Sequence, residues 1–205
     1  MRVLARFLLA ATHVGHFPAP GVPEVAFLGR SNVGKSHLIN SLVNHKIART
    51  SSTPGRTQSI NFFEIRWPGN PRPELMFADL PGYGYARVPR EISSRWPEFI
   101  EPYLRTRRSL ALCLALVDAN VPPQESDKQL LTFLHDSGRR FVVVATKTDK
   151  LSGNQAASAL RTLRQELPPH VELLSYSART GAGRDELWQK IRKAVRDHGM
   201  NYAQS

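Results

Sequence analysis

Short apolar runs alternate with longer amphipathic segments along the whole chain. Several apolar runs are rich in β-branched or aromatic residues, and the later ones are apolar on both faces, which is typical of strands covered on both sides. The amphipathic segments place their apolar residues on one helical stripe. We expect strands at residues 25–28, 60–67, 74–80, 110–119, 141–146 and 171–176, and helices at 35–44, 90–105, 125–137, 154–167 and 184–196.

One junction between expected strands lacks a helix. Residues 60–67 and 74–80 are joined only by PGNPRP, whose turn-forming residues predict a hairpin. Elsewhere strands alternate with helices, which predicts a parallel, doubly wound sheet. The expected fold class is α/β, a three-layer sandwich with a six-stranded, mostly parallel sheet, one antiparallel strand and about five helices.

The length of 205 residues suits one well-buried domain. We expect an N-terminal arm at 1–21, the domain at 22–200 and a short tail at 201–205. The arm resembles a secretory signal, but Arg6 interrupts its apolar stretch. No other apolar run is long enough to span a bilayer, so a soluble, cytoplasmic protein is expected. We also expect it to be a monomer. Cys113, the single cysteine, lies in an apolar run and is expected in the core.

The charge is strongly basic. Lys and Arg number 28 against 17 Asp and Glu, which gives a net charge of +11. Such a field attracts polyanions, and RNA or DNA is the favoured partner. The alternative is that the basic residues only keep the surface soluble, a task that acidic residues perform as well.

The segment GRSNVGKS follows the first expected strand and opens the first expected helix, the setting that the phosphate-loop pattern G-x-x-x-x-G-K-[ST] requires. Its backbone N–H groups and the helix N-terminus attract a phosphate. Lys35 is expected to reach the β- and γ-phosphates, and the Ser36 hydroxyl to bind Mg²⁺. The predicted nucleotide-binding residues here are Gly29, Arg30, Ser31, Asn32, Val33, Gly34, Lys35 and Ser36.

A phosphate loop alone does not distinguish ATP from GTP. The segment TKTD, with Thr146, Lys147 and Asp149, follows the fifth expected strand at the edge where ligands of open α/β sheets bind. Asp149 is expected to accept hydrogen bonds from guanine N1–H and N2–H₂, which adenine lacks, with the Lys147 stem along the base. After the last strand, Ser177 and Ala178 are placed to offer guanine O6 a backbone N–H. Standing alone, TKTD would be an ordinary helix cap, and an ATPase is the rival that Asp149 argues against.

Asp79 ends an apolar run just before PGYGYA. In that position it can hold Mg²⁺ through water, while the Gly82 N–H faces a γ-phosphate. Loss of that phosphate would release the loop that follows. In the upstream loop, Thr57 is the candidate for a second Mg²⁺ hydroxyl, and Thr53 is its competitor. The predicted nucleotide-binding residues of the upstream loop are Gly55, Arg56 and Thr57.

The ordered set GRSNVGKS, STPGRTQSINFF, DLPGYGYARV, TKTD and SYSA resembles the EngB (YihA/YsxC) family of ribosome-biogenesis GTP-binding proteins, over about residues 20–200. The resemblance implies one P-loop GTPase domain that binds GTP and GDP, Mg²⁺ at Ser36 and Thr57, and a role in assembling the large (50S) ribosomal subunit that growth and cell division require. His37 and Arg179 depart from the residues usual in the family without changing the expected class.

Many GTPases orient the attacking water with a glutamine after the glycine that senses the γ-phosphate, and this chain has Tyr83 there. Three replacements are open: K⁺ held at Asn32, Arg56 acting in cis, or help from the ribosomal partner. Lys35, Asn32 and Thr57 are the residues assigned catalytic roles. Slow intrinsic hydrolysis is expected, and a GTP-dependent binding module with negligible catalysis is the alternative.

Two basic clusters are candidates for rRNA contact. Tyr83 and Tyr85 are candidates for stacking on bases, although packing against a helix is the expected fate of at least one. Solvated helix faces explain the final cluster about as well. The first cluster is Arg87, Arg90, Arg95, Arg105, Arg107 and Arg108, and the second is Lys190, Arg192, Lys193 and Arg196.

Overall fold

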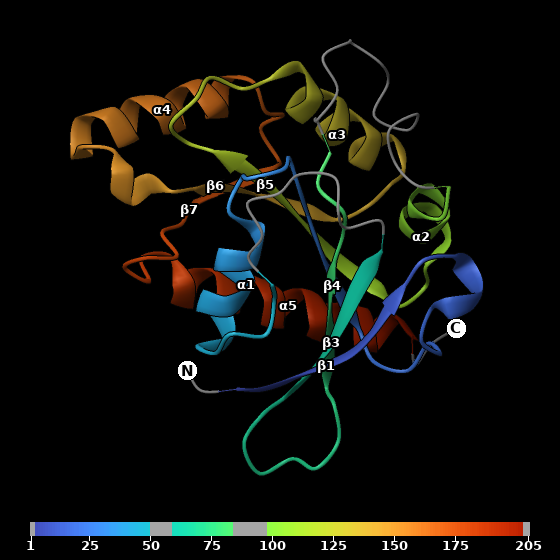
Figure 1. Ribbon diagram of the computed structural model, residues 1–205. Helices are drawn as coiled ribbons and strands as arrows, with labels where there is room; N and C mark the ends of the chain where they lie inside the picture. The colour runs from blue at the N-terminus through green and yellow to red at the C-terminus, as the bar shows by residue number, and fades with distance from the viewer. Residues whose placement is uncertain (1–2, 50–58, 84–97, 203–205) are drawn as a thin grey trace.

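A computed structural model describes residues 3–49, 59–83 and 98–202. Within these ranges one sheet of seven strands forms the centre of the molecule, with helices on both faces (Figure 1). Its strands are β1 (Leu4–Ala11), β2 (Glu24–Gly29), β3 (Ile60–Arg66), β4 (Leu75–Asp79), β5 (Leu110–Asp118), β6 (Phe141–Thr146) and β7 (Glu172–Ser175).

The strand order from edge to edge is β1-β3-β4-β2-β5-β6-β7. β2 pairs in parallel with β4 and β5, and β6 pairs in parallel with β5 and β7. β3 runs antiparallel to β4 and to β1, so it is the one antiparallel strand. The α/β fold and the predicted hairpin are therefore confirmed, and the carboxyl ends of five parallel strands meet at one edge.

The seventh strand, β1, comes from the segment predicted to be an arm. It pairs with β3 in a register that sets Arg6 opposite Glu64, and the Arg6 guanidinium lies 2.7 Å from the Glu64 carboxylate. The Phe7 ring packs edge-on against Phe63, with 5.8 Å between the centroids. In sequence the segment resembles a secretory signal, and only its pairing with β3 in the folded structure reveals the strand.

Helices cover both faces. In the described part of the chain they are α1 (Lys35–Val43), α2 (Ile100–Thr106), α3 (Glu125–Asp136), α4 (Gly153–Gln165) and α5 (Arg184–Tyr202), with 3-10 turns η1 (Val14–His16) and η3 (Thr148–Lys150). α4 begins at a capping box formed by Ser152 and Gln155. α5 continues beyond the predicted end, and the first part of the predicted 90–105 helix lies outside the described residues.

The sheet separates two apolar cores. α1 and α5 lie together on one face (Figure 1), where Leu38 and Trp188 belong to one buried cluster. α2, α3 and α4 contribute Tyr103, Leu134 and Leu163 to the cluster on the other face. Cys113 is fully buried in this second core, where burial raises the pKa of its thiol to about 12, so it serves packing as predicted.

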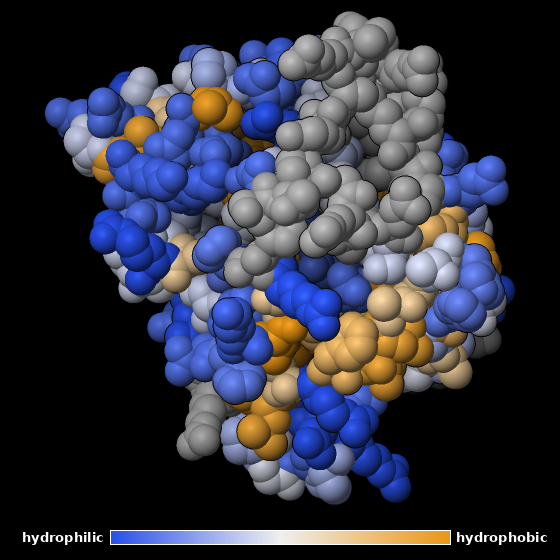
Figure 2. Space-filling model, viewed as in Figure 1, coloured by the Kyte–Doolittle hydropathy of each residue, from blue (hydrophilic) through white to orange (hydrophobic). Residues whose placement is uncertain are grey.

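Apolar side chains also reach the surface over β1, as Figure 2 shows on its lower part. Leu4 is 45% exposed and Phe7 is 51% exposed. β1 is an edge strand, and the charged Arg6 on it discourages pairing with other chains. No helix among the described residues is long and apolar enough to cross a membrane.

A buried ion pair lies at the start of β2. Glu24 is 1% exposed and accepts hydrogen bonds from Arg107 Nε at 2.9 Å, Tyr103 Oη at 2.8 Å and Ser109 Oγ at 2.8 Å. Arg107 is itself buried, which corrects its prediction as an rRNA contact. The Arg107 guanidinium balances the charge of the buried Glu24 carboxylate. The sequence does not show that Glu24 is buried, so it does not distinguish Arg107 from the other arginines of its cluster.

Glu24→Gln is expected to lower the free energy of unfolding by about 3 to 5 kcal/mol, because it leaves the buried Arg107 charge without its anionic partner. Glu64→Gln is the matched control, since its partner Arg6 is exposed, and it should cost no more than about 1 kcal/mol. Urea denaturation of the two variants measures both effects. Equal losses would show that the Glu24 pair contributes no more than a surface pair.

Candidate nucleotide site

The phosphate loop connects β2 to α1. Gly34, at the helix start, has φ of 104°, a conformation that favours glycine. Gly29 cannot carry a side chain, because a Cβ there would lie 2.8 Å from Val33 Cγ1 and 3.0 Å from the Leu116 carbonyl oxygen. The backbone of the predicted loop therefore requires glycine at these two positions, and the loop lies directly before the N-terminus of α1, an end that attracts anions.

Lys35 and Asp79 meet at this point. Asp79 ends β4, opposite Phe27 of β2, and the Lys35 ammonium donates a hydrogen bond to its carboxylate. Both side chains are largely buried. Ser36 is the next residue of α1, so a hydroxyl and a carboxylate, both hard oxygen donors, flank the lysine. This donor set fits Mg²⁺ that is also held by phosphate oxygens.

Gly82 lies directly against the phosphate loop. A Cβ on Gly82 would be 3.0 Å from the Ser31 backbone nitrogen. The Ser31 N–H in turn donates to the Tyr83 carbonyl at 3.0 Å, and Arg30 and Tyr83 form a parallel bridge. The two segments expected to meet the phosphates are thus joined through their backbones.

The TKTD segment packs over the same loop. Thr146 Oγ1 donates to the Val33 carbonyl at 2.7 Å. Lys147, at a left-handed φ of 59°, donates from Nζ to the Asn32 carbonyl and to Asp118, each at 2.7 Å. Burial raises the pKa of Asp118, but hydrogen bonds from Lys147 and Asn120 outweigh it and lower the pKa overall. The lysine is therefore held across the site by an anionic carboxylate.

Asp149 is held by two donors. Ser177 Oγ lies 2.7 Å from Oδ1, and Arg179 Nε lies 2.7 Å from Oδ2. The hydrogen bonds from Ser177 and Arg179 lower the pKa of Asp149, so it stays an anionic acceptor. The turn after Ser177 depends on Gly183, at φ of 81°, where a Cβ would clash with the Ser175 carbonyl oxygen at 2.1 Å. Ala178 lies in this turn, and its expected role toward guanine O6 stays a prediction.

Several predicted residues fall outside the described ranges. They are Thr53, Gly55, Arg56, Thr57, Tyr85, Arg87, Arg90 and Arg95. Their assigned roles stay predictions.

Two further predictions concern described residues of the proposed RNA surface. Tyr83 is only 2% exposed, so it is the tyrosine that packs inside and does not offer a ring for base stacking. Arg105 pairs with Glu101 at 2.7 Å and lies over the Phe133 ring. In the second cluster, Lys190 pairs with Glu172 and Arg192 lies over Trp67, while Lys193 and Arg196 are exposed.

Sequence reasoning missed three side chains at this site. Asp118 carries a findable signal, because it ends a buried strand at the carboxyl edge. Arg179 was noted only as a departure from a family pattern, yet it contacts Asp149. Asp127 resembles a helix cap in sequence, and nothing local connects it to Arg30, its partner in the structure.

Comparisons with known proteins agree with this geometry. A family model described as "50S ribosome-binding GTPase" matches residues 24–147. Among solved structures, a probable GTP-binding protein EngB superposes with a TM-score of 0.65 at 25% identity, covering 85% of this chain and 99% of that one. Era in complex with MgGDPNP and nucleotides 1506–1542 of 16S ribosomal RNA gives a TM-score of 0.68 at 25% identity, covering 85% of this chain and 57% of that one.

The similarity in sequence to several other relatives is higher. The probable GTP-binding protein EngB of Koribacter versatilis is 60% identical over 195 residues, which cover 95% of this chain and 96% of the relative. The match spans the phosphate loop, the hairpin and the Asp149 turn alike. The chain therefore belongs to the EngB family of GTP-binding proteins.

Proposed function

We propose that this protein hydrolyses GTP slowly with Mg²⁺ and acts in the cytoplasm as a nucleotide-dependent assembly factor for the large (50S) ribosomal subunit, required for normal growth and cell division. The observation that carries the guanine part is the Asp149 carboxylate, which is held by Ser177 and Arg179 two positions after Lys147, the residue bonded to the phosphate loop. Guanine offers two donors to such an acceptor, and adenine does not.

Ribosomal RNA as the partner is supported by charge and by relatives. The net charge of +11 favours a polyanion. The matching family model carries the description "50S ribosome-binding GTPase", and one structural neighbour was solved with ribosomal RNA. Lys193 and Arg196 are exposed on α5, and Arg105 and Arg108 are exposed in and just after α2, so these four belong to the described part of the candidate contact surface.

Slow hydrolysis is supported by the placement of Tyr83. Its ring is buried and its hydroxyl donates to Asp127 at 3.4 Å, so it does not take the place of a water-orienting glutamine. Asn32 is exposed on the phosphate loop, where a K⁺ ion could supply the missing positive charge. The ribosomal particle is the other source of help, and a binding module with negligible catalysis is the second candidate function.

Co-sedimentation with 50S particles in GDP, GTP and GDPNP tests the partner. We expect GTP and GDPNP to favour binding over GDP, and binding to weaken steeply as salt rises. Binding that ignores the nucleotide would remove the switch and leave the GTP site intact. Absence of binding in every nucleotide at low salt would contradict the proposed partner.

Phosphate release in K⁺ and Na⁺ buffers, with and without 50S particles, tests the catalytic part. We expect slow release from the protein alone in Na⁺ and faster release with K⁺ or particles, because either supplies transition-state charge stabilisation that the chain lacks. Equal, fast rates in all four conditions would contradict slow intrinsic hydrolysis. No release in any condition would favour the binding module.

A further inference from the structure

One buried carboxylate joins three segments of the protein. Asp127, in the first turn of α3, is 2% exposed. Arg30 Nε lies 3.0 Å from its Oδ1 and 3.1 Å from its Oδ2, and the Tyr83 hydroxyl donates to Oδ1 at 3.4 Å. The Gln124 backbone N–H donates to Oδ2 at 3.1 Å. We call the set of Arg30, Tyr83 and Asp127 the Asp127 junction.

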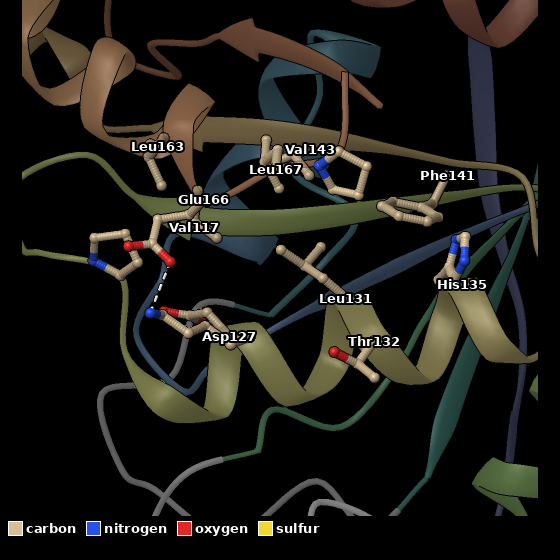
Figure 3. A pocket seen from close by; sticks show the side chains of 13 residues that line it. Val117, Asp127, Leu131, Thr132, His135, Phe141, Val143, Leu163, Glu166 and Leu167 are labelled. Carbon is tan, nitrogen blue, oxygen red and sulfur yellow. Dashed lines mark ion pairs between the residues drawn. The ribbon is translucent and has the colours of Figure 1, made fainter. Parts of the chain in front are cut away.

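The surroundings of the Asp127 carboxylate go beyond what a helix cap requires. Asp127 borders a cavity of about 330 Å³ between α3 and α4, and Figure 3 shows the apolar side chains of Leu131, Leu163 and Leu167 facing that cavity. Burial raises the pKa of Asp127, and the nearby Arg30 guanidinium opposes that effect. Burying a carboxylate at this point costs free energy unless it is paired. Arg30 and Tyr83 must therefore stay in contact with Asp127.

Both partners belong to the segments that are expected to meet the phosphates. Arg30 follows Gly29 at the start of the phosphate loop, and Tyr83 follows Gly82. Their backbones are already joined by the Ser31 N–H to Tyr83 carbonyl bond of 3.0 Å. The side chains of both residues then converge on Asp127, which belongs to neither segment.

We propose that Asp127 is a positioning residue for the γ-phosphate: by holding Arg30 and Tyr83 together, it fixes the spacing between the phosphate loop and Gly82. This inference rests on the proposed GTP hydrolysis. The carboxylate touches no substrate. It restrains the two segments between which the γ-phosphate is bound, so the Gly82 N–H is held in place to receive it.

The test is Asp127→Asn, which keeps the shape of the side chain and removes its charge. We expect kcat for GTP to fall about 10- to 100-fold, because a small misplacement at the γ-phosphate is costly, while GDP affinity stays within about threefold. The preference for GDPNP over GDP should fall as well. Glu125→Gln is the matched control, since it makes the same charge change at an exposed position in the same helical turn, and it should leave all three quantities unchanged.

A second variant separates positioning from stability. Arg30→Met combined with Asp127→Leu replaces the buried pair by apolar side chains, which is often neutral or stabilising for the fold. A double variant that melts like the wild type and binds GDP with wild-type affinity, but turns GTP over more slowly than the wild type and has a lower GDPNP-to-GDP preference, supports positioning. The unchanged GDP affinity excludes a lost contact of Arg30 with the nucleotide, and the result holds also where Asp127→Asn fails to fold. Normal turnover and preference in the double variant would overturn the inference.

The two proposals fail in different ways. Wild-type protein that binds GDP but releases no phosphate under any condition contradicts the proposed hydrolysis. The positioning inference is then decided by the GDPNP-to-GDP affinity ratio, which Asp127→Asn should still lower. Wild-type ratios in the folded Asp127→Asn variant, together with wild-type turnover where turnover is measurable, would overturn positioning alone.

Discussion

Asp149→Asn is expected to change the preference of this protein from guanine to xanthine nucleotides by a factor of about 10⁴. The Asp149 carboxylate is an anion in a fixed orientation, with Ser177 and Arg179 as its donors. Each guanine hydrogen bond to such an anion contributes about 1.5 to 3 kcal/mol. Asparagine keeps one uncharged acceptor for N1–H and turns a donor toward N2–H₂, so GDP binding should weaken by about 10² or more. The asparagine amide can instead donate to the carbonyl that xanthine carries at C2, which recovers affinity for that base.

Titration with fluorescent GDP and with xanthosine diphosphate as competitor measures the change. Asp136→Asn, which makes the same charge change at an exposed position of α3, is the control and should bind GDP normally. Unchanged guanine preference in Asp149→Asn would mean that the base is read elsewhere. Equal loss of affinity for both bases would point to a collapsed Ser177 turn and would contradict direct readout.

Lys35→Met is expected to lower kcat/KM for GTP by a factor on the order of 10³, because removing one preorganised charge from a phosphate site has this magnitude. Lys35 is the cation beside Asp79 at the N-terminus of α1, and both side chains are largely buried. Methionine keeps the length of the stem and removes the charge. GDP affinity should fall too, because the lysine is expected to reach the β-phosphate.

Phosphate release and GDP titration check the Lys35 result. Arg161→Met, at an exposed position of α4, removes a positive charge without touching the site and should leave both measurements unchanged. Thermal unfolding of both variants shows whether the fold is retained. A folded Lys35→Met protein with kcat/KM within tenfold of wild type would contradict the assigned role.

The local parts of the site could be predicted from sequence. The spacing of Gly29, Gly34 and Lys35 is a local signal that identifies the phosphate loop within one short segment. The alternation of strands and helices then places Asp79 and Asp149 at the same edge, because parallel strands end there together. The position of Asp79 beside the phosphate loop follows from these two rules, whereas its hydrogen bond with Lys35 is seen only in the structure.

The remaining parts depend on contacts between distant residues. Arg30 and Asp127 are 97 positions apart, and Glu24 and Arg107 are 83 apart. An aspartate at the third position of a helix is common as a cap, and an arginine in a basic run is commonly solvated. Only the packed structure shows that Asp127 and Arg107 are buried and paired, because burial is a property of the whole fold.

The strand at the edge of the sheet also sets an order of events in folding. Leu4 pairs with Arg66 and Ala11 with Ile60, so β1 has no partner until β3 has been made. A growing chain therefore carries β1 as an unpaired apolar segment until β3 has been made. During that interval β1 is exposed to pairing with another copy of the chain.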